Sequence, residues 1–139
     1  MYLLDTNVVS ELRRPKPHGS VVAWLESVPD AHLHLSAVTL GELQAGVEIT
    51  REQDLEKAEA IETWIEQVAQ TWNVLPLDGR LFRVWARLMH RRSHELIEDA
   101  MIAATATVHD LVVVTRNLRD FEPFGVKTLD PFALRQGRR

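Results

Sequence analysis

The sequence contains no cysteine among its 139 residues. This absence excludes disulfide bridges, thiolate zinc sites and cysteine nucleophiles, and it fits a protein of the reducing cytoplasm. No apolar run approaches the roughly 20 residues that a membrane-spanning helix needs. The N-terminus also lacks a basic segment followed by a long apolar stretch, so the sequence predicts neither a membrane segment nor a signal peptide.

Aromatic residues make up only 6% of the chain, but 45% of its residues are hydrophobic, which is enough for the core of one ordinary domain. We expect this domain to span residues 1–134 and a basic tail to occupy residues 135–139. The net charge of −4 does not by itself indicate nucleic-acid binding. Positive charge is nevertheless concentrated, because eight of the 13 arginines lie at 80–92 and 135–139, and arginine suits bidentate phosphate contacts.

Short apolar runs alternate with helical patterns along the chain. The pattern predicts strands at residues 2–4, 33–35, 74–77, 111–114 and 127–129, and helices at 8–14, 21–28, 39–49, 54–72, 79–93 and 97–109. Continuous apolar strands separated by helices favour an α/β fold with a parallel sheet covered on both faces. Ligands bind outside the carboxyl ends of the strands in such folds.

Two glycines lie inside the helix predicted at 39–49. Gly41 and Gly46 each cost about 1 kcal/mol relative to alanine in a helix interior. We interpret them as a sign that another element packs closely against this helix.

Four acidic residues stand at positions that one sheet edge would bring together. Asp5 closes the first strand, and Asp120 lies five residues after the fourth. Glu42 and Asp99 begin helices next to the second and fourth strands, and their small or apolar neighbours indicate that both face inward. Two charges 4 Å apart repel by about 4 kcal/mol at an effective dielectric constant of 20. We therefore expect a divalent cation with oxygen ligands, Mg²⁺ or Mn²⁺.

Small polar residues accompany these acids. They can hold a water molecule or orient the metal ligands, and they are Thr6, Asn7, Thr115 and Asn117. Such a site favours phosphoryl chemistry, because a bound metal can activate water and neutralise charge on a phosphate.

Each acid also has an ordinary structural explanation. Asp5 can cap a helix, and Asp99 can interact with a helix dipole. Glu42 can be a solvated helix residue, and Asp120 can be a turn former. These structural roles and a metal site remain open alternatives on physical grounds alone.

Four segments resemble, in order, the motifs of the PIN-domain family, and in particular those of the VapC/FitB-type toxins of bacterial toxin–antitoxin pairs. They are residues 2–11, 35–46, 99–106 and 114–121. Each segment is weak alone, but the ordered set is highly specific. The resemblance implies a PIN-like α/β/α sandwich with a five-stranded parallel sheet. It says least about residues 50–95, which carry no family motif.

The same resemblance implies a function. It implies an endoribonuclease toxin that depends on Mg²⁺ or Mn²⁺, forms a homodimer and is inhibited by a small VapB-type antitoxin, in a heterotetramer or a larger complex. Asp5, Glu42 and Asp99 match the three core acids, with Asp5 and Asp99 as principal ligands. Asp120 matches the fourth, more variable acid, and Thr115 and Asn117 match its polar neighbours.

Arginines recur every three or four residues in the helix predicted at 79–93. They are Arg80, Arg83, Arg87 and Arg91, and on one helix they would form a basic stripe that could follow an RNA backbone. The alternative is a solvated face whose positive charge balances the glutamates of the helix at 54–72.

Two further functions compete with the nuclease. A catalytically silent PIN-fold module that keeps only the antitoxin contact would have no physical reason to retain a repulsive acidic cluster. A phospho-accepting signalling domain also has an acidic Mg²⁺ pocket, but it needs a lysine near its acceptor. None of the three lysines, Lys16, Lys57 and Lys127, follows a polar strand end.

Overall fold

The computed structural model describes residues 1–134, so the expected tail with Arg135, Arg138 and Arg139 lies outside the described residues. Five short strands form one sheet in the order β3-β2-β1-β4-β5, and every neighbouring pair is parallel. The strands are β1 (Tyr2–Leu4), β2 (Leu33–Ser36), β3 (Asn73–Leu75), β4 (Val112–Val114) and β5 (Thr128–Leu129). The predicted five-stranded parallel sheet is thus confirmed.

Helices connect the strands, as the sequence pattern predicts. They are α1 (Thr6–Glu11), α2 (Gly19–Ser27), α3 (Ala37–Arg51), α4 (Leu55–Thr71), α5 (Gly79–Met89), α6 (Ile97–His109) and α7 (Leu118–Phe121). Short 3₁₀ turns occupy Asp30–His32, His94–Leu96 and Glu122–Phe124. Side chains of Asp5, Ser36, Asp54 and Asp78 cap the N-termini of α1, α3, α4 and α5, which satisfies backbone N–H groups that a helix leaves free.

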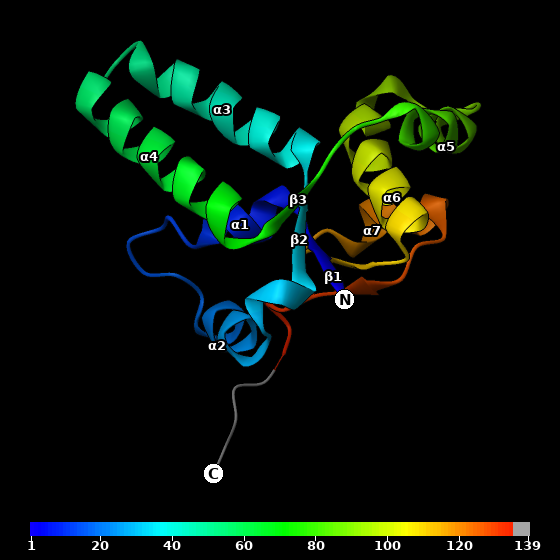
Figure 1. Ribbon diagram of the computed structural model, residues 1–139, viewed down its shortest axis with the longest axis horizontal. Helices are drawn as coiled ribbons and strands as arrows, with labels where there is room; N and C mark the ends of the chain where they lie inside the picture. The colour runs from blue at the N-terminus through cyan, green and yellow to red at the C-terminus, as the bar shows by residue number, and fades with distance from the viewer. Residues whose placement is uncertain (135–139) are drawn as a thin grey trace.

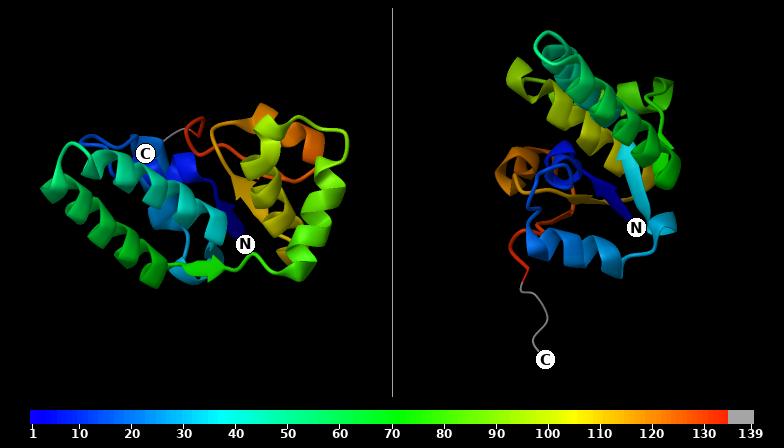
Figure 2. Two further views of the ribbon diagram at one scale, coloured as in Figure 1. Left: turned by 90° about the horizontal axis from the view of Figure 1, so that it is seen from above. Right: turned by 90° about the vertical axis from the view of Figure 1, so that its left-hand side faces the viewer.

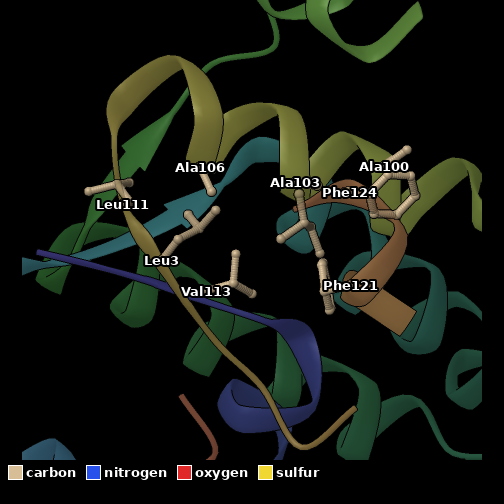
Figure 3. Close-up of a cluster of buried hydrophobic side chains, with 9 residues drawn as sticks. Leu3, Ala100, Ala103, Ala106, Leu111, Val113, Phe121 and Phe124 are labelled. Atoms are coloured by element: carbon tan, nitrogen blue, oxygen red, sulfur yellow. The ribbon is translucent and has the colours of Figure 1, made fainter. Parts of the chain in front are cut away.

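Alternating side chains of the strands bury both faces of the sheet. Leu3 and Val113 point to one face, where α6 and the α7 segment supply Ala103 and Phe121 (Figure 3). The next residue along β1, Leu4, points to the opposite face and packs with residues of α1, α2 and β2. Because successive side chains of a strand alternate, two hydrophobic layers form, which is the predicted α/β/α arrangement.

The longer helices pair on opposite sides of the molecule. Helix α3 packs along α4, and α5 packs along α6. Figure 1 shows the α3–α4 hairpin on the left and the α5–α6 pair on the right, and the left view of Figure 2 shows the same separation, while α2 lies apart below the strands in its right view. None of the helices in residues 1–134 is long and apolar enough for a bilayer crossing.

Two local expectations are wrong. The helix predicted at 79–93 ends at Met89, and Arg91 has a left-handed φ of 62°, so Arg91 lies in a turn beyond the helix. The glycines of α3 are not sites of close packing either. A Cβ atom at Gly41 or Gly46 would meet no heavy atom within 4 Å, because both positions face outward.

The open space at Gly46 gives a stability prediction. We expect Gly46→Ala to raise the free energy of unfolding by about 0.5–1 kcal/mol, because alanine restricts the unfolded chain and favours helix without a steric penalty. Denaturant titration of the purified protein measures this change.

Gly125→Ala is the matched control. Its surroundings are equally open, but its φ of 67° is left-handed, so we expect a loss of about 1–2 kcal/mol. Destabilisation by Gly46→Ala would contradict the assignment of free space beside α3.

Candidate active site

The candidate site lies where the strand order of the sheet reverses. From β1 the sheet continues to β2 on one side and to β4 on the other. In open α/β sheets, ligands bind outside the carboxyl ends of the strands at such a switch point. Asp5 directly follows β1 and Thr115 directly follows β4, and the backbone N–H of Asp5 donates to the carbonyl of Val114 at 2.9 Å. The topology therefore places these two polar residues side by side at the expected position.

Asp5 is the most buried acid of the site, with an exposed fraction of 5%. Its Oδ1 accepts the backbone N–H of Thr6 at 2.8 Å, and its Oδ2 accepts the Thr115 hydroxyl at 2.8 Å and the Asn7 amide at 3.1 Å. A carboxylate has about four lone-pair directions, so Oδ1 keeps one for a further ligand. The capping role that the sequence left open is real, and it leaves room for a second role.

Glu42 is positioned by the hydroxyl of Thr6, which itself contacts Thr39. The Thr6 hydroxyl donates to Glu42 Oε1 at 2.7 Å and lies 3.2 Å from the Thr39 hydroxyl, which is completely buried. Burial, followed by contact with Glu98, raises the pKa of Glu42 to about 7, against the lowering effect of the Thr6 hydrogen bond. Glu42 is half-buried, and with a pKa of about 7 it is partly protonated near neutral pH. It is therefore not the simple solvated helix residue of the alternative.

Asp99 occupies the first turn of α6 and is also half-buried. Burial raises its pKa to about 6, and the negative charges of Asp5, Asp120 and Glu98 add to the effect. Burial likewise raises the pKa of Asp5, with a contribution from Asp120. These mutual effects place the charges of the four predicted acids within electrostatic reach of one another.

The ligand roles of these acids remain a prediction. In residues 1–134, no three or more His, Asp or Glu side chains are grouped closely enough to hold a metal ion as they stand. Asp120 is exposed on the short helix α7, whereas Asp5, Glu42 and Asp99 are buried or half-buried.

The donor set nevertheless fits a hard divalent cation. All four candidate ligands offer carboxylate oxygens, as Mg²⁺ and Mn²⁺ prefer. None of the ion pairs formed within residues 1–134 involves any of the four acids, so no lysine or arginine neutralises them. Asp5 and Asp99 would hold the cation, with Glu42 and Asp120 completing its surroundings directly or through water.

The four predicted supporting residues act in different ways. Thr115 donates to Asp5 and accepts both the Asn7 amide at 3.2 Å and the backbone N–H of Asn117 at 3.0 Å. Thr6 orients Glu42, as described above. Asn117 supports the site only through its backbone in these contacts. These bonds fix the Asp5 carboxylate from β4 and α1 together.

Sequence reasoning missed two residues of the site, Glu98 and Thr39. Glu98 contacts Glu42 and raises its pKa, but it is adjacent to Asp99 on a helix and its direction depends on how α6 is rotated. Thr39 lies beneath Thr6, and only the approach of α1 to α3 reveals that contact.

The arginines of α5 form a basic surface with three of the four predicted members. Arg80, Arg83 and Arg87 line a hollow of about 520 Å³, whereas Arg91 lies beyond the helix. The glutamates of α4 do not neutralise the charge of this surface. Helix α4 packs on α3, and no ion pair within residues 1–134 joins α4 to α5. The pairing with those glutamates is absent from the described residues, but Arg80, Arg83 and Arg87 are exposed, so a solvated face and a role in RNA binding both remain predictions.

The sequence profile of the PIN domain matches residues 2–125. The chain belongs to the PIN-domain family. Toxin FitB of Neisseria gonorrhoeae is 34% identical over 139 residues, covering 95% of this chain and 99% of FitB. A VapC ribonuclease of Sinorhizobium fredii is 35% identical, covering 95% of this chain and 98% of that protein. The crystal structure of FitAcB from Neisseria gonorrhoeae superimposes with a TM-score of 0.86 at 34% identity, over 96% of this chain and all of that chain.

The acids of this PIN-domain chain make its stability depend on pH. Asp5, Glu42 and Asp99 have folded-state pKa values above their ordinary values, so the folded protein binds more protons than the unfolded chain. Their contribution is complete below about pH 4, and the parts due to Asp99 and Glu42 are lost as the pH rises through about 6 and about 7. We expect the melting temperature in EDTA to fall by several degrees between pH 5 and pH 8, measured by scanning fluorimetry.

A divalent cation should reverse this trend. Mg²⁺ or Mn²⁺ binds the ionised acids of the folded state, so we expect it to raise the melting temperature more at pH 8 than at pH 5. Asp99→Asn should flatten the pH dependence and reduce the gain from the cation. A melting temperature that rises with pH in EDTA would contradict the cluster.

Proposed function

We propose that this PIN-domain chain is an endoribonuclease toxin that depends on Mg²⁺ or Mn²⁺, hydrolyses RNA phosphodiester bonds and is neutralised by a VapB-type antitoxin. The observation that carries the proposal is the group of four electrostatically coupled acids at the switch point of the sheet, buried or half-buried in three cases and without an ion-pair partner in residues 1–134. The FitB and VapC relatives support the same reading. The expected homodimer and the cytoplasm as compartment belong to this proposal.

The chemistry follows from how these acids are held. A bound divalent cation would activate water and neutralise charge on the phosphate. Asp5, fixed by Thr115 and Asn7, and Asp99, fixed on α6, would hold that cation. Glu42 has a pKa of about 7, so it can accept a proton from the attacking water near neutral pH. The hydrogen bond from Thr6 orients Glu42 for this step.

The basic surface of α5 would bind the RNA strand. Arg80, Arg83 and Arg87 share one hollow, and α5 packs on the helix that carries Asp99. The RNA strand would pass over α5 as well as over the acidic centre. Arg91 does not line this hollow, because it stands in the turn after the helix.

The second candidate function is a catalytically silent module that keeps only the contact to an antitoxin. The structure offers no reason for such a module to keep Asp5, Glu42 and Asp99 close together, because their repulsion and desolvation are unfavourable in the absence of a cation. We therefore favour the nuclease, and the following experiment separates the two.

The nuclease proposal predicts discrete RNA fragments when the protein, free of any partner, is incubated with total RNA and Mg²⁺ or Mn²⁺. We expect no cleavage in EDTA and a loss of at least about 100-fold in Asp5→Asn and Asp99→Asn, since each variant removes one charge from the metal site. Gel electrophoresis and fragment counting measure this activity.

Glu66→Gln is the matched control, because it removes one carboxylate from an exposed position of α4 away from the site. It should cleave like the parent. Intact RNA under every metal condition, with a cooperatively melting protein, would favour the silent module.

The basic surface predicts a separate effect on RNA affinity. We expect Arg83→Ala with Arg87→Ala to weaken binding of single-stranded RNA by about tenfold or more and to reduce its salt dependence, because two phosphate contacts are lost. The melting temperature should change little, since both side chains are exposed.

Arg51 is unsuitable as a control because it joins Glu48 to Glu62. Lys57→Ala, at an exposed position of α4, serves instead and should bind like the parent. Equal binding by the double arginine variant and the parent would remove α5 from the RNA path.

A further inference from the structure

A basic groove begins beside the acidic centre and runs toward the loop after α1. One hollow, of about 320 Å³, is lined by Asn7, Ser10, Glu11, Arg14, Arg116 and Phe132. A second hollow, of about 480 Å³, shares Glu11, Arg14 and Arg116 with the first and extends to Pro15, Lys16 and His18. The shared walls make these hollows one continuous feature, which we name the Arg116 groove.

The groove carries a net positive charge. Arg14, Lys16 and Arg116 contribute three cations, and Glu11 is the only carboxylate in its walls. Glu11 is already engaged, because it is buried, pairs with Arg14 at 3.4 Å and accepts the backbone N–H of His18 at 2.9 Å. Among the ion pairs of residues 1–134, none uses Lys16 or Arg116, so both can bind an external anion.

Arg116 is held in place from two sides. Its guanidinium lies 4.4 Å from the centre of the Phe132 ring, and the His18 ring meets Phe132 edge to face at 5.4 Å. Its backbone N–H donates to Asn7 Oδ1 at 3.2 Å, and the amide of the same Asn7 donates to Asp5. A planar guanidinium that is stacked in advance loses little freedom when it binds a phosphate.

Arg116 also lines a hollow that includes Asp120. A third hollow, of about 400 Å³, is lined by Arg116, Asn117, Leu118, Arg119 and Asp120. Arg116 therefore stands between the candidate metal ligand Asp120 and the basic groove. A chain of phosphates that leaves the acidic centre past Arg116 enters the groove directly.

We propose that the Arg116 groove binds the phosphates of single-stranded RNA next to the bond that is cut. The inference rests on the proposed ribonuclease function and adds a second basic surface, carried by α1, its following loop and the end of β4. Arg116 contacts the nearest phosphate, and Arg14 and Lys16 contact phosphates further along. We favour RNA over an acidic peptide because Arg116 shares a hollow with Asp120, a candidate residue of the proposed ribonuclease centre.

Fluorescence anisotropy with a labelled single-stranded RNA tests the groove in an Asp99→Asn background without divalent ions, where binding is separate from cleavage. We expect Arg116→Ala and Lys16→Ala each to weaken binding by about tenfold at low salt and to reduce the slope of log affinity against log salt by about 0.7, the value for one phosphate on a single strand. Arg116→Lys keeps the charge but loses the planar guanidinium with its paired N–H donors. Its RNA affinity should lie between that of the Asp99→Asn background and that of Arg116→Ala.

Arg13→Ala is the matched control. Arg13 adjoins Arg14 and has the same charge, but its guanidinium lies 5.7 Å from the centre of the Trp64 ring and outside the groove. It should bind RNA within about twofold of the background, since it makes no phosphate contact. Melting curves confirm folding, and Lys16→Ala and Arg116→Lys decide the question if Arg116→Ala does not fold.

Three results would overturn the groove. The first is unchanged RNA affinity in Lys16→Ala and both Arg116 variants, and the second is an equal loss of affinity in Arg13→Ala. The third is binding of a polyglutamate peptide that depends on Arg116 while RNA binding does not, which would assign the surface to an acidic protein partner. If RNA binding depends on Arg116 but the chain with Asp99 intact never cuts RNA, the groove stands and the ribonuclease proposal fails.

Discussion

The hydrogen bond from the Thr115 hydroxyl to Asp5 joins the end of β4 to the end of β1, at the point where the strand order reverses. Asp5 is buried, and the donors it receives from Thr6, Asn7 and Thr115 are all neutral. Its charge is thus held in position but not cancelled. Helices α3 and α6 then bring Glu42 and Asp99 toward the same charge, so the fold concentrates an electrostatic penalty that only protons or a cation can relieve.

The polar residues around the acids follow from this constraint. A lysine or arginine within reach of Asp5 would have lowered its pKa and satisfied its remaining lone pair, leaving nothing for a metal. Hydroxyl and amide groups instead orient the carboxylates while preserving their negative charge. Thr39 shows the same logic one layer deeper, because this fully buried hydroxyl contacts Thr6, which in turn donates to Glu42. Neutral hydrogen-bond donors therefore orient the carboxylates of Asp5 and Glu42 and leave their negative charge available to a cation.

The sequence predicted the features that depend on local patterns. Apolar runs and capping residues such as Asp5 and Asp78 located the strands and helices closely, and parallel topology then placed the acids at one edge. Features that depend on helix rotation or on distant contacts were missed. Glu98 could not be assigned to the site from its spacing alone, and Gly46 faces open space rather than a neighbour. Arg91 lies beyond the end of α5, and the sequence did not reveal this boundary because no glycine or proline marks it.

Opposite charges are segregated in this protein, and their segregation explains how an acidic chain can attract a polyanion. Arg51 neutralises Glu48 and Glu62 where α3 meets α4, further along α3 than Glu42. Near the site, by contrast, the arginines of α5 and of the Arg116 groove line hollows and leave the four acids unpaired. If those arginines paired with the acids, both surfaces would lose their capacity to bind ions. Keeping them apart allows the acids to attract a divalent cation while the arginines attract phosphates on either side, so the net charge of −4 says little about the field that an RNA strand would meet.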